Sequence, residues 1–415
     1  ASDVRDAAGF AYVDDVGYAT ADLATVLFRL ARAVPGRVYL GSVNRQPPAG
    51  AGAISAPVRT VDAALYHLAT EAKALNRSGS DFRVLSHLAW QQDLTEGASG
   101  PWVRIGGGSD AGLSGCYAYP GTPSTEILEY LDHLGGHAQW SPNEKVAMEV
   151  ALGAAFAGAR TLVTMKHVGL NVAADPLFTA TYTDVAGGLV VVSADDPGMA
   201  SSQNEQDNRH YARAAALPML EPMDSQQAYD YTRLAFDVSE RWRIPVILRL
   251  TTRVCHSKTR VRPHAPLAAS REHGFRRDIP ARVMIPAYAK PAHHRLRQKL
   301  AEIAAWNEAE GPTREFEGRA ELGIVATGIA AVHAREAAPQ ARLLTVGLTY
   351  PLPIESIRRF ATGCERLAVI EEADPVLHDA LRAAGIPAEG KPEAYRFGEL
   401  TVPRVRRILD RDETP

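Results

Sequence analysis

The residues of this chain that could do chemistry are concentrated between residues 116 and 207. A Pro-Gly turn carries the hydroxyl of Thr122, a predicted helix begins near Glu144, and an apolar strand runs into Lys166 and His167. Free N–H groups at a helix start bind carboxylates, and an imidazole changes its charge near neutral pH. These residue types suit the binding of a small acid and the transfer of a proton. In an open α/β sheet such groups gather at the carboxyl ends of the strands.

Glu144 admits two interpretations. The order Ser141-Pro142-Asn143-Glu144 fits a capping box with Pro142 as the first helical residue, which stabilises a helix by about 1 kcal/mol and has no further function. As a functional group, Glu144 would be a buried carboxylate, followed by a small-residue helix that lets a ligand ring approach. Caps are common, so the residues alone favour the first interpretation. Glu149, on the same helix, is expected to be exposed.

The turn at residues 119–124 also has two interpretations. Gly121 permits close approach of a ligand to the backbone, and Pro123 is placed to start a helix. Thr122 is then either the N-cap of this helix or a hydroxyl that, with the free N–H groups around it, holds a carboxylate. Both roles can coexist.

A third group of polar residues follows the apolar run TLVTM. His167 could donate a proton to a substrate carbonyl, although a single histidine after a strand is more often a structural hydrogen-bonding residue. Beyond the next strand lies a polar loop, residues 195–207, with Asp195 and Asp196 at its start. The Pro-Gly that follows them indicates a turn rather than a magnesium site. We expect this loop to line the active site or a subunit interface.

Strands and helices alternate from residue 115 onward, which predicts a mostly parallel sheet covered on both faces. The apolar runs that predict strands are 115–119, 161–165, 188–194, 217–222 and 244–250. The predicted helices are 123–134, 142–157 and 225–242, the last with Asp224 as its N-cap and Gln227 three residues on. Later in the chain, a helix at 293–311 and strands at 321–328, 341–348 and 366–372 predict a second, smaller α/β domain.

The first 105 residues give weaker signals. The sequence predicts helices at 19–34 and 61–75, strands at 37–43 and 81–90, and a loop at 47–57. We therefore divide the chain as follows: an unassigned region at 1–105, a first α/β domain at 106–257, a linker at 258–280 and a second α/β domain at 281–415.

Composition limits the function further. The net charge of −3 over 415 residues gives no electrostatic reason to expect nucleic acid or an anionic membrane as partner. The sequence shows no apolar run long enough to span a bilayer and no signal-peptide pattern, so a cytoplasmic location is expected. There are three cysteines, at 116, 255 and 364, without CxxC spacing. A [4Fe–4S] cluster normally needs four thiolates, so any such cluster is expected on another chain.

Four motifs, in order, resemble one enzyme family. They are YPGTPS at 119–124, WSPNEKVA at 140–147, TMKHVGLN at 164–171 and SADDPGMASSQNEQDNR at 193–209. They are similar to the alpha subunits of indolepyruvate:ferredoxin oxidoreductases, within the thiamine-diphosphate-dependent 2-oxoacid:ferredoxin oxidoreductases. The resemblance is dense over 115–257 and traceable over 280–409. It implies a pyrimidine-binding domain followed by a transketolase C-terminal-like domain.

The resemblance also implies roles for individual residues. Glu144 would hydrogen-bond N1′ of the cofactor's aminopyrimidine, which reverses the preference for a mere cap, and His167 would act beside it in catalysis. Residues implied to bind the cofactor, besides Glu144, are Tyr119, Gly121 and Asn171. Residues implied to bind the substrate are Thr122, Lys166 and Gln203.

Partners follow from what the family needs. The diphosphate and Mg²⁺ are held in the family by a GDG motif, which does not occur in this sequence. This suggests a short form of the alpha subunit without the diphosphate-binding and ferredoxin domains. Thiamine diphosphate would be shared with a partner chain that carries Mg²⁺, and iron–sulfur clusters would lie on a partner, in a dimer of heterodimers. The expected reaction is oxidative decarboxylation of an aryl 2-oxoacid to an acyl-CoA, with electrons passed to ferredoxin.

Two alternatives stay open from the sequence. One is a subunit of a redox-free split decarboxylase or synthase that also uses thiamine diphosphate. The other is a non-catalytic subunit that keeps the fold without the cofactor.

Overall fold

The computed structural model describes the backbone of residues 3–5, 11–13, 38–42 and 52–56, and residues 111–257, 259, 261–265, 267 and 274–414. The chain divides into two compact units, Ala1–Ala98 and Ser99–Pro415. The helices predicted at 19–34 and 61–75 and the strand predicted at 81–90 lie outside the described residues. The domain boundaries proposed above stay predictions.

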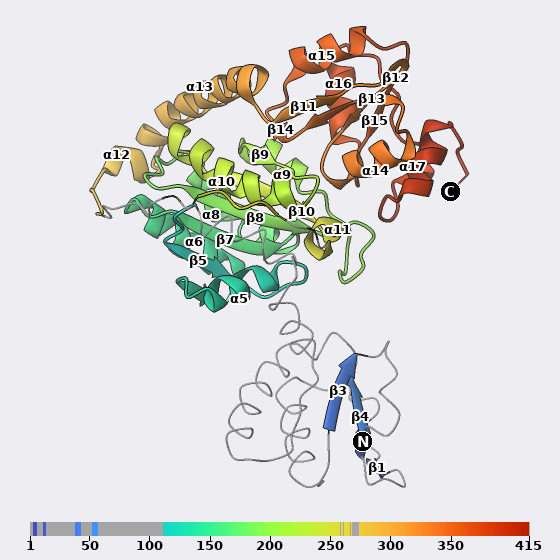
Figure 1. The fold of residues 1–415 in the computed structure, drawn as a ribbon. Coiled ribbons are helices and arrows are strands. Elements are labelled where there is room, and N and C mark those ends of the chain that lie inside the picture. Colours follow the sequence, from blue (N-terminus) through green and yellow to red (C-terminus); the bar gives the residue numbers. More distant parts are fainter. Residues whose placement is uncertain are drawn as a thin grey trace. The chain divides into compact units, whose positions relative to one another are not determined.

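The described part of the first unit is a four-stranded sheet (Figure 1). Its strands are β1 (Asp3–Arg5), β2 (Ala11–Val13), β3 (Val38–Ser42) and β4 (Gly52–Ala56), in the order β1-β2-β4-β3. The strand predicted at 37–43 is confirmed as β3. The loop predicted at 47–57 is wrong, because five of its residues form β4, which pairs in parallel with β3. Glycine and alanine suggested a loop, but backbone pairing with a neighbouring strand decided the conformation.

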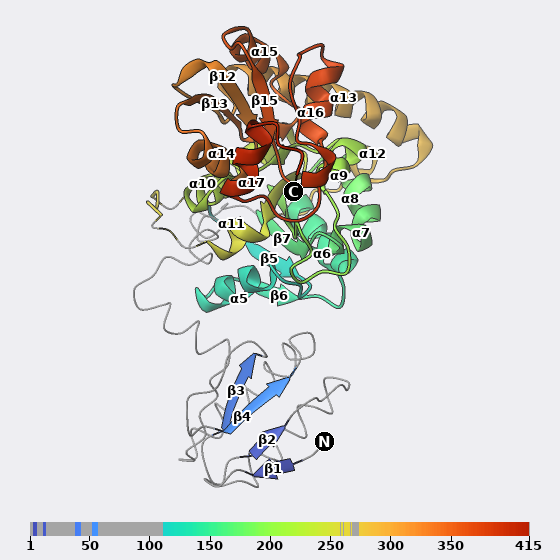
Figure 2. The same ribbon diagram turned by 90° about the vertical axis from the view of Figure 1, so that its right-hand side faces the viewer.

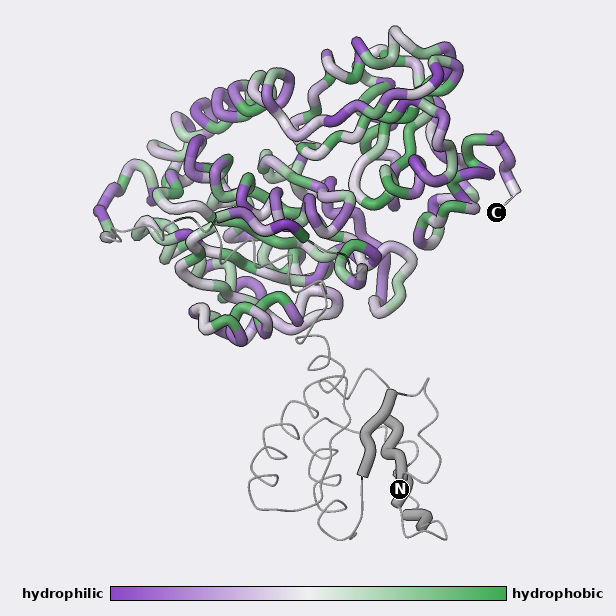
Figure 3. The backbone as a smooth tube through the Cα atoms, in the orientation of Figure 1, coloured by the Kyte–Doolittle hydropathy of each residue, from purple (hydrophilic) through white to green (hydrophobic). Residues whose placement is uncertain are grey.

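A seven-stranded sheet organises the first part of the second unit. Its strands are β5 (Gly115–Ala118), β6 (Ala138–Trp140), β7 (Thr161–Lys166), β8 (Leu189–Asp195), β9 (Met219–Leu220), β10 (Val246–Thr251) and β14 (Leu348–Tyr350). The order is β14-β9-β10-β8-β7-β5-β6, and all neighbours pair in parallel except β14, which runs antiparallel to β9. The five predicted apolar runs are confirmed as strands, and the α/β fold class with a parallel sheet is confirmed with them. In Figure 3 these strands are mostly hydrophobic, as burial between helices requires.

Helices connect these strands and cover the sheet (Figure 1). They are α5 (Thr125–His133), α6 (Glu144–Phe156), α7 (Gly169–Val172), α8 (Ala174–Ala180), α9 (Arg209–Ala215), α10 (Ser225–Trp242) and α11 (Thr252–His256). The prediction for α10 is confirmed in detail, since an Asp224 carboxylate oxygen accepts a hydrogen bond of 2.8 Å from the Gln227 N–H. Such a cap depends only on neighbouring residues, which is why the sequence predicts it.

The order of the strands creates a switch point between β5 and β7. From β5 the chain moves outward to the edge strand β6 and then crosses back to β7, on the other side of β5. The connections that follow β5 and β7 therefore leave the carboxyl ends of these neighbouring strands in opposite directions. Ligands in open α/β sheets bind at such a point.

A second sheet of four strands lies beside the first within the same unit (Figure 1). Its strands are β11 (Thr313–Phe316), β12 (Arg319–Ala326), β13 (Ala341–Val346) and β15 (Leu367–Ile370), in the order β11-β13-β12-β15. The accompanying helices are α12 (Ile279–Arg282), α13 (Pro286–Glu310), α14 (Ile329–Ala337), α15 (Ile354–Thr362), α16 (Val376–Ala383), a 3₁₀ turn (Glu393–Tyr395) and α17 (Val402–Leu409). Figure 2 shows α14 and α17 side by side. The three predicted strands are confirmed.

Helix α13 begins earlier than predicted. It starts at Pro286 rather than residue 293 and continues through Pro291. Hydrophilic and hydrophobic residues alternate along it in Figure 3. Across the described part of the chain, none of the helices combines the length and apolar character that crossing a membrane would require.

Candidate active site at the switch point

The parallel register brings the predicted site residues to one edge of the seven-stranded sheet. Ala118, at the end of β5, lies opposite Thr164 of β7 and Trp140 of β6. The turn at 119–124, the start of α6 and the residues after β7 therefore leave the sheet together. Gly121 lies so near Lys166 that a Cβ built on this glycine would be 3.0 Å from the Cβ of Lys166.

The turn after β5 differs from its predicted form. Helix α5 begins at Thr125, so Pro123 is not its first residue and Thr122 is not its N-cap. The turn is instead closed from within: the Gly121 N–H donates to the Thr125 hydroxyl at 2.8 Å, and the Ser124 hydroxyl donates to the Gly121 carbonyl at 2.7 Å. Local capping therefore leaves the half-buried Thr122 hydroxyl unused.

Helix α6 also begins differently. Asn143 is its N-cap and accepts a hydrogen bond of 3.0 Å from the Val146 N–H. The predicted capping box that begins at Ser141 is wrong, because Ser141 and Pro142 lie before the helix. The Ser141 hydroxyl is buried and finds no hydrogen-bond partner among the described residues. Glu144 is therefore the first residue of the helix, and the cap does not require its side chain.

The Glu144 carboxylate lies against Gly169, the first residue of α7. A Cβ built on Gly169 would lie 2.6 Å from a Glu144 carboxylate oxygen, closer than such atoms approach. Glu144 is half-buried rather than buried as expected, and among the described residues its carboxylate makes no hydrogen bond or ion pair. Glu149 is exposed, as predicted, and lies 3.8 Å from Lys145. Sequence reasoning missed Gly169, although it lies within the quoted motif TMKHVGLN.

Gly169→Ala is expected to displace the Glu144 carboxylate and to lower activity strongly. The added methyl group would overlap that carboxylate, and misplacing a reacting group by about 1 Å can cost about 100-fold in rate. Turnover of the assembled enzyme and the thermal midpoint of the chain test this. Gly153→Ala is the matched control, because nothing lies within 4 Å of a Cβ there. Equal activity of the two variants would contradict the contact.

His167 is fully buried behind the loop that follows β8. Its Nε2 lies 3.2 Å from the Asn204 carbonyl oxygen and 3.3 Å from the Asn204 side-chain oxygen, so this nitrogen is the natural site of the ring proton. The other ring nitrogen, Nδ1, is buried without a hydrogen-bond partner in the described part of the chain. In this conformation His167 supports the loop, and its role as a proton donor stays a prediction.

Gln206 connects the segment after β7 to the loop after β8. Its amide pairs with the exposed Asn171 through two hydrogen bonds of 2.9 Å, and its nitrogen also lies 3.1 Å from the His167 carbonyl oxygen. Asn208 donates to the same carbonyl at 3.1 Å, and the Tyr211 hydroxyl donates to Asn171 at 2.6 Å. These positioning contacts were not predicted, because they join residues about 40 positions apart.

The remaining predicted residues occupy the rim. Lys166 donates to the Ser201 carbonyl at 2.7 Å. Burial by itself would raise the pKa of Asp196, but hydrogen bonds from Ser202 and Ser201 and the charge of Lys166 outweigh it, so that this pKa is lowered. Gln203 is exposed. Its neighbours in the loop, Ser201, Asn204 and Gln206, make the contacts with Lys166, His167 and Asn171 that are described above. Tyr119 is exposed too, at 40% of its surface.

Comparison with known proteins decides the family. A family model described as pyruvate flavodoxin/ferredoxin oxidoreductase, thiamine diphosphate-binding, matches residues 108–314. The chain is 41% identical over 311 residues to indolepyruvate oxidoreductase subunit IorA of Methanothermobacter thermautotrophicus and 40% identical over 303 residues to the subunit of that name from Archaeoglobus fulgidus. The chain belongs to the thiamine-diphosphate-dependent 2-oxoacid:ferredoxin oxidoreductases.

These alignments each cover 70% of this chain, and 50% and 49% of the two relatives, so the chain spans about half the length of the curated relatives it matches. A solved structure, 2-oxoglutarate:ferredoxin oxidoreductase from Magnetococcus marinus, shares the fold with a TM-score of 0.63 at 17% identity, covering 92% of this chain and 85% of that one. The fold class predicted from the sequence therefore agrees with that of a known member of the family.

In this family member the loop behind the candidate site is held by a buried arginine. Arg249, on β10, forms ion pairs with Asp195 at 2.7 Å and with Glu221 at 2.9 Å, and Asp207 lies at 3.6 Å. All four side chains are almost fully buried. Burial raises the pKa of Asp195, partly offset by the Arg249 charge, whereas the charges of Arg209 and Arg249 lower that of Asp207 against the effect of burial.

A second buried arginine ties the loop to the four-stranded sheet. Arg209, the first residue of α9, contacts Asp207 at 2.5 Å and Glu371 at 2.6 Å. It also donates to the carbonyl groups of Glu372 and Asp374, at 2.6 and 2.8 Å. Residues 371–374 follow β15, so Arg209 joins the carboxyl edge of the four-stranded sheet to the loop beside His167.

Glu372 makes this junction sensitive to pH. Burial raises its pKa from 4.5 to about 7, and burial lowers the pKa of the nearby Lys391 to about 8. Because the folded pKa of Glu372 lies above the unfolded one, its protonated form stabilises the fold. That contribution is complete below pH 4.5 and is lost as the pH rises through about 7.

Glu372→Gln is therefore expected to flatten the pH dependence of stability. A shift from 4.5 to about 7, in which the opposing Lys391 charge is already included, corresponds to about 3 kcal/mol. Between pH 5 and pH 8 the free energy of unfolding should fall by about 2 kcal/mol more in the original chain than in the variant. Urea unfolding at both pH values measures this, and parallel curves for the two proteins would refute it.

Proposed function

We propose that this chain supplies the half of a thiamine-diphosphate site that holds the aminopyrimidine ring. The observation that carries the proposal is the Glu144 carboxylate, which lies half-buried against Gly169 at the switch point and has no partner among the described residues. A carboxylate in such a place is stabilised when a ligand donates a hydrogen bond to it. The family match over residues 108–314 supports the same cofactor.

Each residue then has a task. Bound thiamine diphosphate supplies the carbon nucleophile for a 2-oxoacid carbonyl. Glu144 would share a proton with ring atom N1′, and Tyr119, Gly121 and Asn171 would help to hold the ring. Gly169 and Gly121 keep the site's own side chains in place, because a Cβ at Gly169 would meet Glu144 and one at Gly121 would meet Lys166.

Substrate binding falls to the rim of the site. The carboxylate of the 2-oxoacid is bound by Lys166 and by Thr122, whose hydroxyl is not used in capping. Gln203 reaches the same carboxylate from the loop after β8. His167 donates a proton to the substrate only when this loop moves, because Asn204 covers its Nε2. Loop movement thus controls access to the site's proton donor.

The whole enzyme oxidises an aryl 2-oxoacid, such as indolepyruvate, to an acyl-CoA and passes the electrons to ferredoxin. The name of the curated relatives supports this substrate. A partner chain supplies Mg²⁺, the diphosphate-binding residues and the iron–sulfur clusters, in a dimer of heterodimers. Exposed apolar side chains on the elements around the site support a partner surface there: Tyr119, Val150, Val172 and Phe178. A cytoplasmic location stays a prediction.

Anaerobic purification of the tagged chain from its native cells tests the proposal. The complex should contain thiamine diphosphate and iron–sulfur absorbance, and the absorbance should bleach on addition of indolepyruvate. A colourless complex that retains thiamine diphosphate would identify a redox-free enzyme instead. A complex without thiamine diphosphate would contradict the assignment of Glu144.

A further inference from the structure

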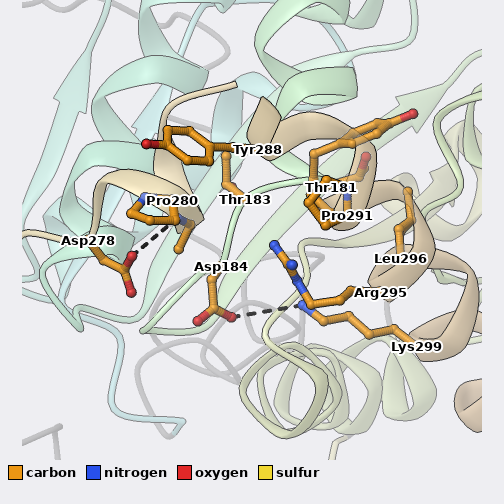
Figure 4. A pocket seen from close by; sticks show the side chains of 13 residues that line it. Thr181, Thr183, Asp184, Asp278, Pro280, Tyr288, Pro291, Arg295, Leu296 and Lys299 are labelled. Atoms are coloured by element: carbon orange, nitrogen blue, oxygen red, sulfur yellow. Dashed lines mark hydrogen bonds and ion pairs between the residues drawn. The ribbon is translucent and has the colours of Figure 1, made fainter. Parts of the chain in front are cut away.

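Figure 4 shows a cavity of about 330 Å³. It lies at the amino ends of the strands of the seven-stranded sheet, whereas Glu144 lies near their carboxyl ends. One wall is formed by residues 181–184, which lead into the amino end of β8, and the others by α12 and α13. The Asp184 N–H donates to the Ala281 carbonyl at 3.3 Å, which ties the first wall to α12. The volume falls in the range of sites that take small molecules, which is about 300–1,000 Å³.

Helix α13 supplies the largest share of the lining. Tyr288, Pro291, Arg295 and Lys299 follow each other at intervals of three or four residues, so their side chains lie along a single stripe of the helix. Figure 4 shows Arg295 and Lys299 reaching from this stripe toward Asp184. The long helix therefore presents both charge and apolar surface to the same space.

The cationic side chains around this cavity outnumber the carboxylates. Asp184 forms an ion pair of 2.6 Å with Arg243, at the end of α10, and lies 3.9 Å from Lys299. Lys299 also donates to the Arg243 carbonyl at 3.0 Å. Asp184 is therefore shared by Arg243 and Lys299. In the described part of the chain, the Arg295 guanidinium makes no hydrogen bond or ion pair.

The second carboxylate of the lining does not correct this excess. Asp278 caps α12 by accepting a hydrogen bond of 3.2 Å from the Ala281 N–H. Burial lowers the pKa of Lys299, and the charges of Arg243 and Arg295 lower it further, while Asp184 opposes them. With Arg243 counted, three cationic groups (Arg243, Arg295 and Lys299) therefore face two carboxylates (Asp184 and Asp278) around the cavity.

Part of the remaining wall is apolar. Tyr288, Pro280, Pro291 and Leu296 provide one aromatic ring, two proline rings and a branched side chain. Rings stack on such surfaces, while a guanidinium binds a carboxylate or phosphate through two parallel hydrogen bonds. The lining therefore combines an anion-binding end with a ring-binding end.

We propose that this cavity binds a small organic anion, a carboxylate or phosphate carried on a ring-sized apolar body, with Arg295 as its principal ligand. The site is separate from the candidate thiamine-diphosphate site, since it lies at the amino rather than the carboxyl ends of the strands. The proposal does not depend on the proposed function. Through residues 181–184 the anion would contact the segment that joins α8 to β8.

Calorimetric titration of the full chain with phenyl phosphate and with phenylacetate tests this, and the two ligands distinguish phosphate from carboxylate. Benzylamine, which carries the opposite charge on the same ring, is the ligand control. At least one of the two anions should bind saturably to one site per chain, and benzylamine should not. Arg295→Glu should weaken that binding at least about tenfold, which corresponds to about 1.4 kcal/mol.

Arg297→Glu is the matched variant, because Arg297 is exposed on the same helix and its charge change is the same, but it does not line the cavity. It should keep the original affinity, as should Glu144→Gln, which places the binding away from the switch point. Arg295→Gln checks the result without reversing charge. The proposal fails if neither anion binds below about 10 mM, if benzylamine binds equally well, or if Arg295→Glu and Arg297→Glu bind alike.

Discussion

Turnover of the assembled enzyme should fall about 100-fold or more when Glu144 is replaced by glutamine, while the stability of the chain should not change. Glutamine has the shape of glutamate and fits against Gly169, but it cannot hold a proton at the cofactor ring as a carboxylate does. The Asn143 cap is untouched, so α6 should start at the same residue. The rate of arylpyruvate-dependent acceptor reduction and the thermal midpoint measure the two effects.

Glu149→Gln provides the control for this experiment. Glu149 lies on the same helix and is exposed, with Lys145 at 3.8 Å as a partner of little energetic weight. Its replacement removes the same charge from α6 and should leave turnover unchanged. If Glu144→Gln kept more than about a tenth of the original rate, a general acid–base role for this carboxylate would be untenable.

Arg209→Met should destabilise the chain by about 3–5 kcal/mol. Methionine fills much of the space of arginine, but it leaves Asp207 and Glu371 buried without their shared cation. Domains are usually stable by only about 5–15 kcal/mol, so this loss would be a large fraction of the total. Urea unfolding at neutral pH, followed by circular dichroism, measures it.

The matched variant is Arg213→Met. Arg213 is on the same helix, α9, but is exposed, so its replacement should change the free energy of unfolding by less than about 0.5 kcal/mol. Similar values for the two variants would show that the buried ion pairs do not hold the loop after β8 to the four-stranded sheet. Because buried charges become less costly when protonated, the Arg209→Met defect should also shrink at low pH.

The main strands and the helix α10 could be predicted from the sequence. Continuous apolar runs such as 188–194 are what a strand buried on both faces requires, and the Asp224 cap depends on a residue three positions away. The short strand β6 and the edge strand β14 could not be predicted. Three residues carry too little pattern, and β14 joins the sheet only by pairing with β9, about 130 positions earlier.

The candidate site was predicted in part. Local pattern placed Lys166 and His167 after a strand end and Glu144 at a helix start, whereas the family resemblance supplied the functional roles of these residues, which stay predictions. Local pattern gave the wrong helix start at Ser141, since serine and asparagine both cap helices and only the path of the chain selects Asn143. The sequence also predicted a buried Glu144, whereas the side chain is half-buried, and it gave no sign of the contact with Gly169.

The sequence by itself therefore determined the α/β class, the positions of the long strands and the residues with chemical potential, because these follow from neighbours along the chain. Only the tertiary structure decided which of those residues meet. Gly169 leaves room for Glu144, Gln206 holds Asn171, and Arg209 joins the two sheets over more than 160 positions. Such contacts depend on how the strands are ordered in the sheet, and no local pattern of residues encodes that order.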